Sequence, residues 1–229
     1  GFILYGTSMV SKELTLEPYY IFKQEDSFKK TPLLNIHTLG TRAVYKKNDW
    51  AIRAELAGQT GEYSDNNDRS GWAGTLFVDK SFKDLPLKPE VTAGIGLLSG
   101  DNPSTSKVEG WDPLFSRYPM YSEILLANYL TETGIIGYYT NLQCYRLATK
   151  LNVTDKTAVT LRYNYFRSFE DTLGNNGYSR GHNPQIQVNH KFNKNWDTTL
   201  LVEYFKPENY YGSNMDDALF IRAELQYKF

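Results

Sequence analysis

Residues Asp217–Phe229 read DALFIRAELQYKF, and their side chains alternate between apolar and polar. One set of alternate positions holds Leu219, Ile221, Ala223, Leu225, Tyr227 and Phe229. The other set holds Phe220, Arg222, Glu224, Gln226 and Lys228. Successive side chains of a β-strand point to opposite faces. A soluble core does not accommodate such a charged row, whereas the wet lumen of a membrane barrel does. The stretch therefore predicts a membrane-spanning strand that ends in an aromatic residue.

The same alternation recurs upstream. Trp50, Ile52, Ala54 and Leu56, for example, alternate with Ala51, Arg53 and Glu55. A slip of one residue would place charged side chains in lipid, so the pattern specifies the register of each strand. The charged side chains that it assigns to the lumen, and that we take as pore-lining or substrate-binding candidates, are Arg42, Arg53, Glu55, Arg146, Lys150, Arg162, Lys191, Glu203, Arg222 and Glu224. His190 and Lys80 fall on the lipid side, where a position near the headgroups would relieve the misfit.

Composition supports a barrel over a helical membrane protein. The mean hydropathy is −0.51, and no run of apolar residues is long enough for a spanning helix. Yet aromatic residues make up 15% of the chain, including 18 tyrosines. A membrane barrel reconciles these values, because only alternate residues face lipid and aromatic rings form a belt at each interface. A soluble β-sandwich also tolerates many tyrosines and is the alternative on composition alone.

The connections between predicted strands alternate in length. Short turns rich in Asn, Asp, Lys and Pro occupy 46–49, 83–87, 152–156 and 193–196. Long polar loops occupy 24–34, 64–70, 101–123, 169–182 and 206–216. Bacterial barrels place short turns in the periplasm and long loops outside. We predict an all-β, antiparallel up-and-down barrel with about eleven strands in this chain.

An odd strand number has two explanations, because closed bacterial barrels normally have an even number of strands. Either a preceding stretch is missing and the chain is the C-terminal portion of a larger barrel, or the segment 124–142 holds an additional strand.

Several function classes find little support. The net charge of −1 disfavours a nucleic-acid partner, and the single cysteine, Cys144, excludes an intramolecular disulfide. No HExxH, Walker or paired CxxC motif occurs, and no cofactor or metal site is predicted. Three histidines, His37, His182 and His190, lie apart, with His182 expected in a solvated loop, so we predict no enzyme. The loop acids at 65–68 and 216–217 fit calcium binding and turn formation equally well.

The segment 99–123 reads SGDNPSTSKVEGWDPLFSRYPMYSE. Its SGD, WDPLF and R-aromatic-P elements, with the later YYTNL and NVTDKTAVTLRY, resemble the alginate-export family of outer-membrane porins. The resemblance covers roughly residues 90–168. The loop-motif residues are Asp101, Trp111, Asp112, Pro113, Leu114, Phe115 and Arg117. The simpler interpretation of this segment is an extracellular loop closed by Asp101 and Pro113.

The resemblance implies one barrel domain over 1–229, belonging to a barrel of about eighteen strands in the outer membrane of a Gram-negative bacterium. It implies passive passage of an anionic oligosaccharide or similar acidic solute through a lumen lined by Arg and Lys. Outer-membrane lipids, lipopolysaccharide and periplasmic export proteins are the other expected partners. A binding or scaffolding barrel with its partner on the loops is the alternative function. If 101–123 folds inward, we expect it to gate the pore.

Overall fold

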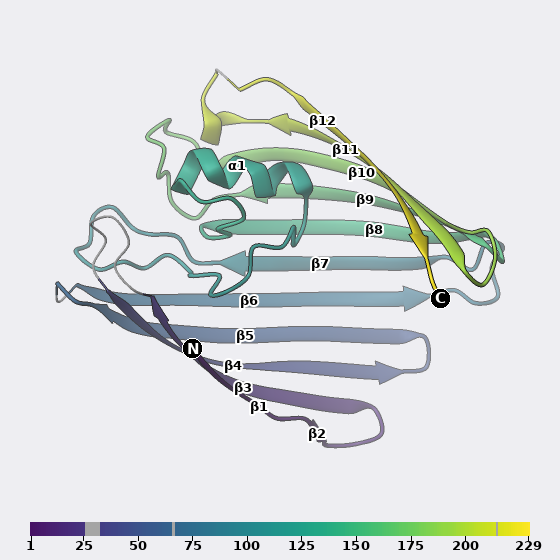
Figure 1. Ribbon diagram of the computed structural model, residues 1–229, viewed down its shortest axis with the longest axis horizontal. Coiled ribbons are helices and arrows are strands. Elements are labelled where there is room, and N and C mark those ends of the chain that lie inside the picture. Colours follow the sequence, from purple (N-terminus) through teal and green to yellow (C-terminus); the bar gives the residue numbers. More distant parts are fainter. Residues whose placement is uncertain (26–32, 66, 214) are drawn as a thin grey trace.

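A computed structural model describes residues 1–25, 33–65, 67–213 and 215–229. They form one 12-stranded antiparallel sheet with a single α-helix in the described part of the chain (Figure 1). The strands are β1 (Phe2–Tyr5), β2 (Ser8–Met9), β3 (Leu14–Glu25), β4 (Leu34–Lys47), β5 (Trp50–Tyr63), β6 (Asp68–Ser81), β7 (Glu90–Leu98), β8 (Leu142–Thr154), β9 (Thr157–Arg167), β10 (Ser179–Lys191), β11 (Trp196–Pro207) and β12 (Ala218–Tyr227). The helices are α1 (Glu123–Thr133) and the 3-10 turn η1 (Asn209–Tyr211).

Each strand from β3 onward pairs with the next along the chain, as an up-and-down sheet requires. Both β1 and β2 pair with β3, so eleven strands lie side by side across the sheet. This confirms the predicted topology and the count of about eleven strands. Between β1 and β12 the described residues show no pairing, and the sheet is open.

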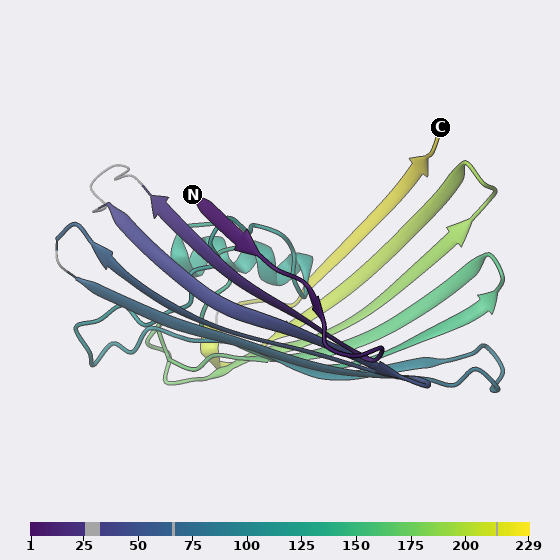
Figure 2. The same cartoon turned by 90° about the horizontal axis from the view of Figure 1, so that it is seen from below.

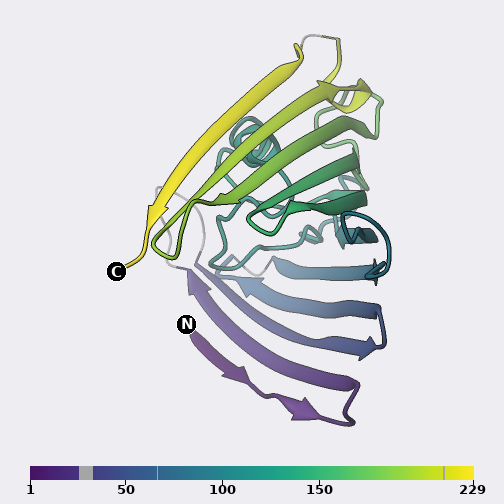
Figure 3. The same cartoon turned by 90° about the vertical axis from the view of Figure 1, so that its right-hand side faces the viewer.

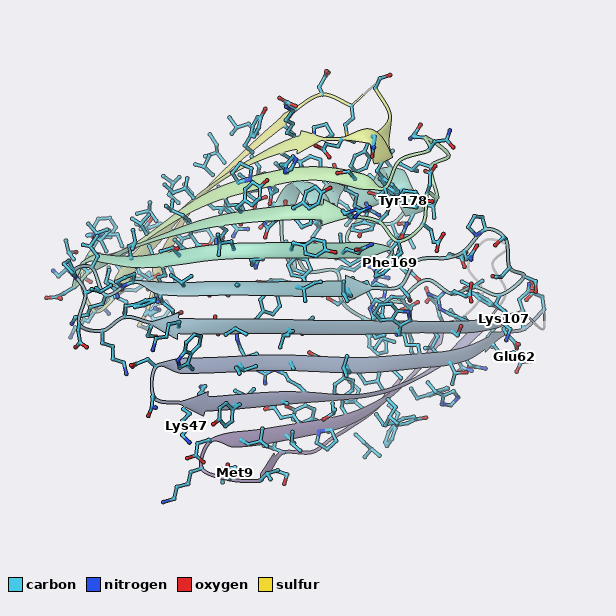
Figure 4. The ribbon with its side chains drawn as sticks, turned by 180° about the vertical axis from the view of Figure 1, so that it is seen from behind. Met9, Lys47, Glu62, Lys107, Phe169 and Tyr178 are labelled. Carbon is cyan, nitrogen blue, oxygen red and sulfur yellow. The ribbon has the colours of Figure 1, made fainter. Side chains whose placement is uncertain are left out.

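The ends of the sheet differ as the sequence predicts. The β4–β5, β6–β7, β8–β9 and β10–β11 connections lie at one end, and the long β7–β8, β9–β10 and β11–β12 connections lie at the other (Figure 1). The β6–β7 connection spans 82–89 and is longer than the predicted turn at 83–87. Figure 4 places Lys47 at the turn end and Glu62, Lys107, Phe169 and Tyr178 at the loop end. The loop at 24–34 lies mostly outside the described residues. Loops 64–70, 169–182 and 206–216 are shorter than predicted, because β6, β10 and β11 extend into them.

The sheet curves strongly, with β1 and β12 on its two raised sides (Figure 2). The segment 99–141, called the inner segment below, lies within the concave side together with α1 (Figure 3). None of the described helices is long and apolar enough to cross a membrane.

The two faces carry the predicted side chains. The convex face exposes apolar residues such as Leu56, which is 68% exposed, and Leu219, which is 65% exposed. Lys80, one of the two misfits on this face, lies at the turn end over the ring of Trp50, 5.0 Å from its centroid. His190 bonds Thr157 and packs on Phe192 at the same end. Their positions at the strand ends agree with the expected headgroup level.

Two expectations for the loops are wrong. The segment 124–142 holds no additional strand before β8 begins at Leu142; its first half is α1, with Ser122 as N-cap and Gly134 in the left-handed conformation at the C-terminus. His182 is not in a solvated loop. It lies in β10, where its Nδ1 contacts the Tyr163 hydroxyl at 2.5 Å and its Nε2 contacts Glu208 at 3.0 Å.

The main hydrophobic cluster lies between the inner segment and the concave face of the sheet. Its buried members are Leu98, Tyr121, Ile124, Leu125, Tyr129, Tyr139, Leu142, Cys144, Phe166 and Phe205. Three of these, Ile124, Leu125 and Tyr129, come from α1, and Phe166 and Phe205 come from β9 and β11. Burial of these rings fixes the inner segment against the wall of the sheet.

Candidate functional site

The site lies on the concave face, where the inner segment meets β5–β12. Period-2 strands project Arg53, Arg146, Arg162 and Arg222 to this face, as the sequence predicts. Two adjoining cavities open there, with volumes of about 270 and 530 Å³. Met120, Tyr121, Arg146 and Arg162 line both cavities, so they form the boundary between them.

Arg146 and Arg162 form the centre of the site, and we call them the guanidinium pair. Arg146 donates to the side-chain oxygen of Asn164 at 2.7 Å and to the backbone oxygen of Tyr121 at 3.0 Å. Arg162 donates to the side-chain oxygen of Gln187 at 2.9 Å. Within the described chain neither forms an ion pair with a carboxylate. Their positive charge is therefore free to attract an anion.

Most other predicted lumen cations are neutralised by carboxylates. Arg42 pairs with Glu17 and lies outside both cavities. Arg53 donates two bonds of 3.0 Å to Asp79. Arg222 forms ion pairs with Glu123 and Glu224.

The remaining predicted lumen residues are divided among three places. Glu203 lines the smaller cavity, and Glu55 and Lys150 line the larger one. Glu55 accepts a bond of 2.7 Å from the hydroxyl of Tyr19. In the described chain Lys150 makes no ion pair. Lys191 lines a third cavity of about 410 Å³ at the turn end, which Lys150 also lines.

Glu203 attaches the start of α1 to the wall. Its carboxylate accepts bonds from the Ser122 hydroxyl at 2.7 Å and from the backbone N–H of Glu123 at 3.1 Å. It is only 2% exposed. The first amides of a helix have no acceptor within the helix, and Glu203 accepts from one of them.

The motif aspartate Asp112 attaches the inner segment to the opposite wall. It is 1% exposed and accepts bonds from Lys23 at 3.2 Å and from the hydroxyl of Tyr138 at 2.9 Å. Burial is the main cause that raises the pKa of Tyr138, which keeps this hydroxyl protonated as a donor. Gln59 exchanges two bonds with the backbone of Asp112, at 2.8 and 2.9 Å.

The other loop-motif residues shape the chain around Asp112. Asp101 accepts a bond from the N–H of Glu109 at 2.7 Å, and Leu114 adopts a positive φ of 57°. Trp111 packs on the main cluster, whereas Phe115 is 56% exposed. Pro113 follows Asp112, and its carbonyl accepts a bond from Ser116. The guanidinium of Arg117 lies 5.3 Å from the ring centroid of Tyr138. Most of these contacts join residues of the inner segment to one another, so they hold the local shape of the segment.

A third attachment joins the end of α1 to β10. Glu132 forms an ion pair with Arg180, whose side chain is 0% exposed. The hydroxyls of Tyr210 and Tyr211 surround the pair. Sequence reasoning missed Arg180 and Glu132, because both lie in stretches interpreted as a loop or a strand. No pattern in a single sequence indicates that an arginine in a predicted loop, such as Arg180, is buried.

Gly96 provides the space for the inner segment at the boundary of the cavities. A Cβ atom at this position would lie 1.9 Å from the Tyr121 hydroxyl oxygen. A side chain here would therefore displace the ring. In the stretch VTAGIGLL, Gly96 lacks a side chain and so leaves room for the ring of Tyr121.

The family model for alginate export matches residues 2–219. The chain belongs to the alginate-export family. A search of curated proteins finds no match. The match confirms the resemblance predicted from the segment 99–123 and extends it over almost the whole chain. The family and the up-and-down sheet together fit an outer-membrane β-barrel that transports polysaccharide.

Proposed function

We propose that this member of the alginate-export family is a passive outer-membrane channel of a Gram-negative bacterium for an anionic polysaccharide or oligosaccharide. The observation that carries the proposal is the guanidinium pair. Arg146 and Arg162 lie between two open cavities and bond amides and a carbonyl in place of carboxylates. A guanidinium presents a planar fork of donors that matches a carboxylate.

Transport requires that the solute leaves as well as enters. Contacts should therefore be many and individually weak. The paired arginines Arg53 and Arg222, together with Glu55 and Glu203, supply charges of both signs in the two cavities beside the guanidinium pair. The arrangement favours diffusion of a polyanion along the wall over tight capture. Catalysis forms no part of this proposal.

We also propose that the 229 residues contribute to one closed barrel domain. The edges β1 and β12 do not pair with one another within the described residues. In hydrocarbon, unsatisfied backbone N–H and C=O groups cost several kcal/mol each, so both edges need partners in the membrane. Lipopolysaccharide and other lipids would cover the convex face, and periplasmic export proteins would approach the turn end.

The inner segment narrows the lumen in this proposal. It lies on the concave side and is attached at Asp112, Glu203 and Glu132. Deleting part of 101–123 should raise the single-channel conductance, because the segment fills space through which ions would pass. Unchanged conductance would contradict a constricting role.

Planar-bilayer recording of the purified protein tests the function. Under a salt gradient, we expect a reversal potential that shows preference for chloride over potassium. An oligogalacturonate should reduce the chloride current. Preference for cations at neutral pH would contradict the guanidinium site as an anion-binding site, but the protein would still be a channel. Absence of any stable conductance would instead support a scaffold that binds a partner through its loops.

A further inference from the structure

The aromatic side chains of the inner segment fall into two groups. Tyr121, Tyr129 and Tyr139 are buried and anchor the segment. Tyr118 is 72% exposed, although it lies between two anchored stretches on the concave side. Its hydroxyl makes no hydrogen bond within the described chain. Packing therefore accounts for the buried tyrosines but not for Tyr118.

Tyr118 lies beside the cationic side chains of the smaller cavity. With Pro119 and Met120 it lines the same space as Arg146, Arg162 and Arg222. An aromatic ring is thus combined with guanidinium groups around about 270 Å³ of open space.

The backbone on both sides of Tyr118 is held in place. On one side, Arg117 donates to the backbone oxygens of Leu114 and Ser116 and lies over the Tyr138 ring. On the other side, the backbone oxygen of Tyr121 accepts bonds from Arg146 at 3.0 Å and from Gln185 at 2.8 Å. A ring presented by a fixed backbone loses little conformational freedom when a ligand binds.

The carboxylates in this cavity are already engaged. Glu203 accepts bonds from Ser122 and from the backbone N–H of Glu123. Glu123 forms an ion pair with Arg222. Among the described residues Arg162 bonds only the neutral side chain of Gln187, and it is therefore the group best placed to bind a carboxylate of a ligand.

We propose that Tyr118 recognises the sugar ring of the transported polyanion, and that the smaller cavity is a uronate subsite. The inference rests on the proposed channel function. A small inorganic anion would use the guanidinium alone, whereas a uronate residue has both a carboxylate and an apolar face of C–H groups. The face stacks on the Tyr118 ring while the carboxylate binds Arg162. Tyr118 thus distinguishes sugar polyanions from other polyanions of equal charge.

The test measures block of the chloride current by two polyanions with the same number of carboxylates, an oligogalacturonate and an oligoglutamate. Tyr118→Ala should weaken block by the sugar several-fold to about tenfold, the range expected for loss of an aromatic contact. Block by the oligoglutamate should stay unchanged. Tyr118→Phe should retain block by the sugar, because the ring remains. Phe115→Ala, at an exposed aromatic residue outside the cavity, is the matched control and should behave as wild type.

Two outcomes would overturn the subsite. Equal sugar block in wild type and Tyr118→Ala would show that the ring makes no contact with the ligand. Equal weakening of block by both polyanions would show that Tyr118 acts through the shape or charge of the pore. Failure of the channel function itself looks different, since wild type would then show no anion preference and no block by either polyanion.

Discussion

The walls formed by β4–β6 and by β8–β9 carry similar basic residues, but these residues have different bonding partners on the two walls. On β4–β6, Arg42 and Arg53 are paired with Glu17 and Asp79. On β8–β9, Arg146 and Arg162 bond Asn164, the Tyr121 carbonyl and Gln187. In the proposed channel, the neighbours of the arginines, and not their number, therefore decide where an anion binds.

Ion pairs on the concave side also differ in their exposure to water. Removing one partner should lower the free energy of unfolding most where the pair is buried. Glu132→Gln leaves Arg180, whose side chain is 0% exposed, without its carboxylate. We expect a loss of about 3–5 kcal/mol in the free energy of unfolding, because an uncompensated charge remains buried. Denaturant unfolding in lipid vesicles measures it.

The matched control is Glu17→Gln, which removes the carboxylate from a pair whose arginine is 42% exposed. The expected cost is much smaller than for Glu132→Gln, since water solvates the remaining guanidinium. Similar losses in the two variants would contradict the distinction between dry and wet pairs.

A smaller effect should appear when one wall is made to resemble the other. Asp79→Asn removes the carboxylate from Arg53 and keeps an amide oxygen beside it, as Asn164 lies beside Arg146. We expect block by oligogalacturonate to strengthen a few-fold, because one more guanidinium is then free to bind a carboxylate of the ligand. Weaker block in this variant would argue that Asp79 positions Arg53 for the ligand.

The smallest effect concerns the turn end. A hydrogen bond from Lys83 to Asp49 lowers the pKa of this aspartate. A carboxylate whose pKa is lowered on folding stabilises the folded state above its unfolded pKa, and the contribution disappears as the pH falls through the folded pKa. Asp49→Asn should therefore slightly lower the unfolding temperature at neutral pH and have no effect in strong acid. Asp155→Asn, at a turn carboxylate without an ion pair in the described chain, should show no such difference.

Sequence reasoning predicted the strands well, because their alternation follows from the geometry of a sheet between water and lipid. Arg146, Arg162 and Arg222 reach the concave face for this reason. Sequence reasoning could not predict which of these arginines have a carboxylate partner and which have a neutral one. The partners Gln187 and Glu123 come from other parts of the chain. The face of the sheet to which a side chain points follows from local sequence, whereas its bonding partners on other strands or on the inner segment do not.

The inner segment shows the opposite case. Its apolar run at 124–131 fits a strand or a helix, and periodicity alone does not decide between them in so short a stretch. Ser122 before the run and Gly134 after it are the capping signals that indicate a helix. The inward path depends on Asp112 and Glu132 bonding to distant strands, and on Ser122 bonding to Glu203 of β11. No local pattern encodes those contacts.

The central claim is that the guanidinium pair, and not the total charge of the lumen, forms the anion site. Arg162→Gln and Arg53→Gln remove the same charge from the wall of the larger cavity. Oligogalacturonate block of the chloride current, measured side by side in planar bilayers, tests it directly. We predict that Arg162→Gln weakens block about tenfold, as expected for loss of a charged hydrogen bond, and that Arg53→Gln changes it about twofold. Equal weakening by the two substitutions would contradict the claim.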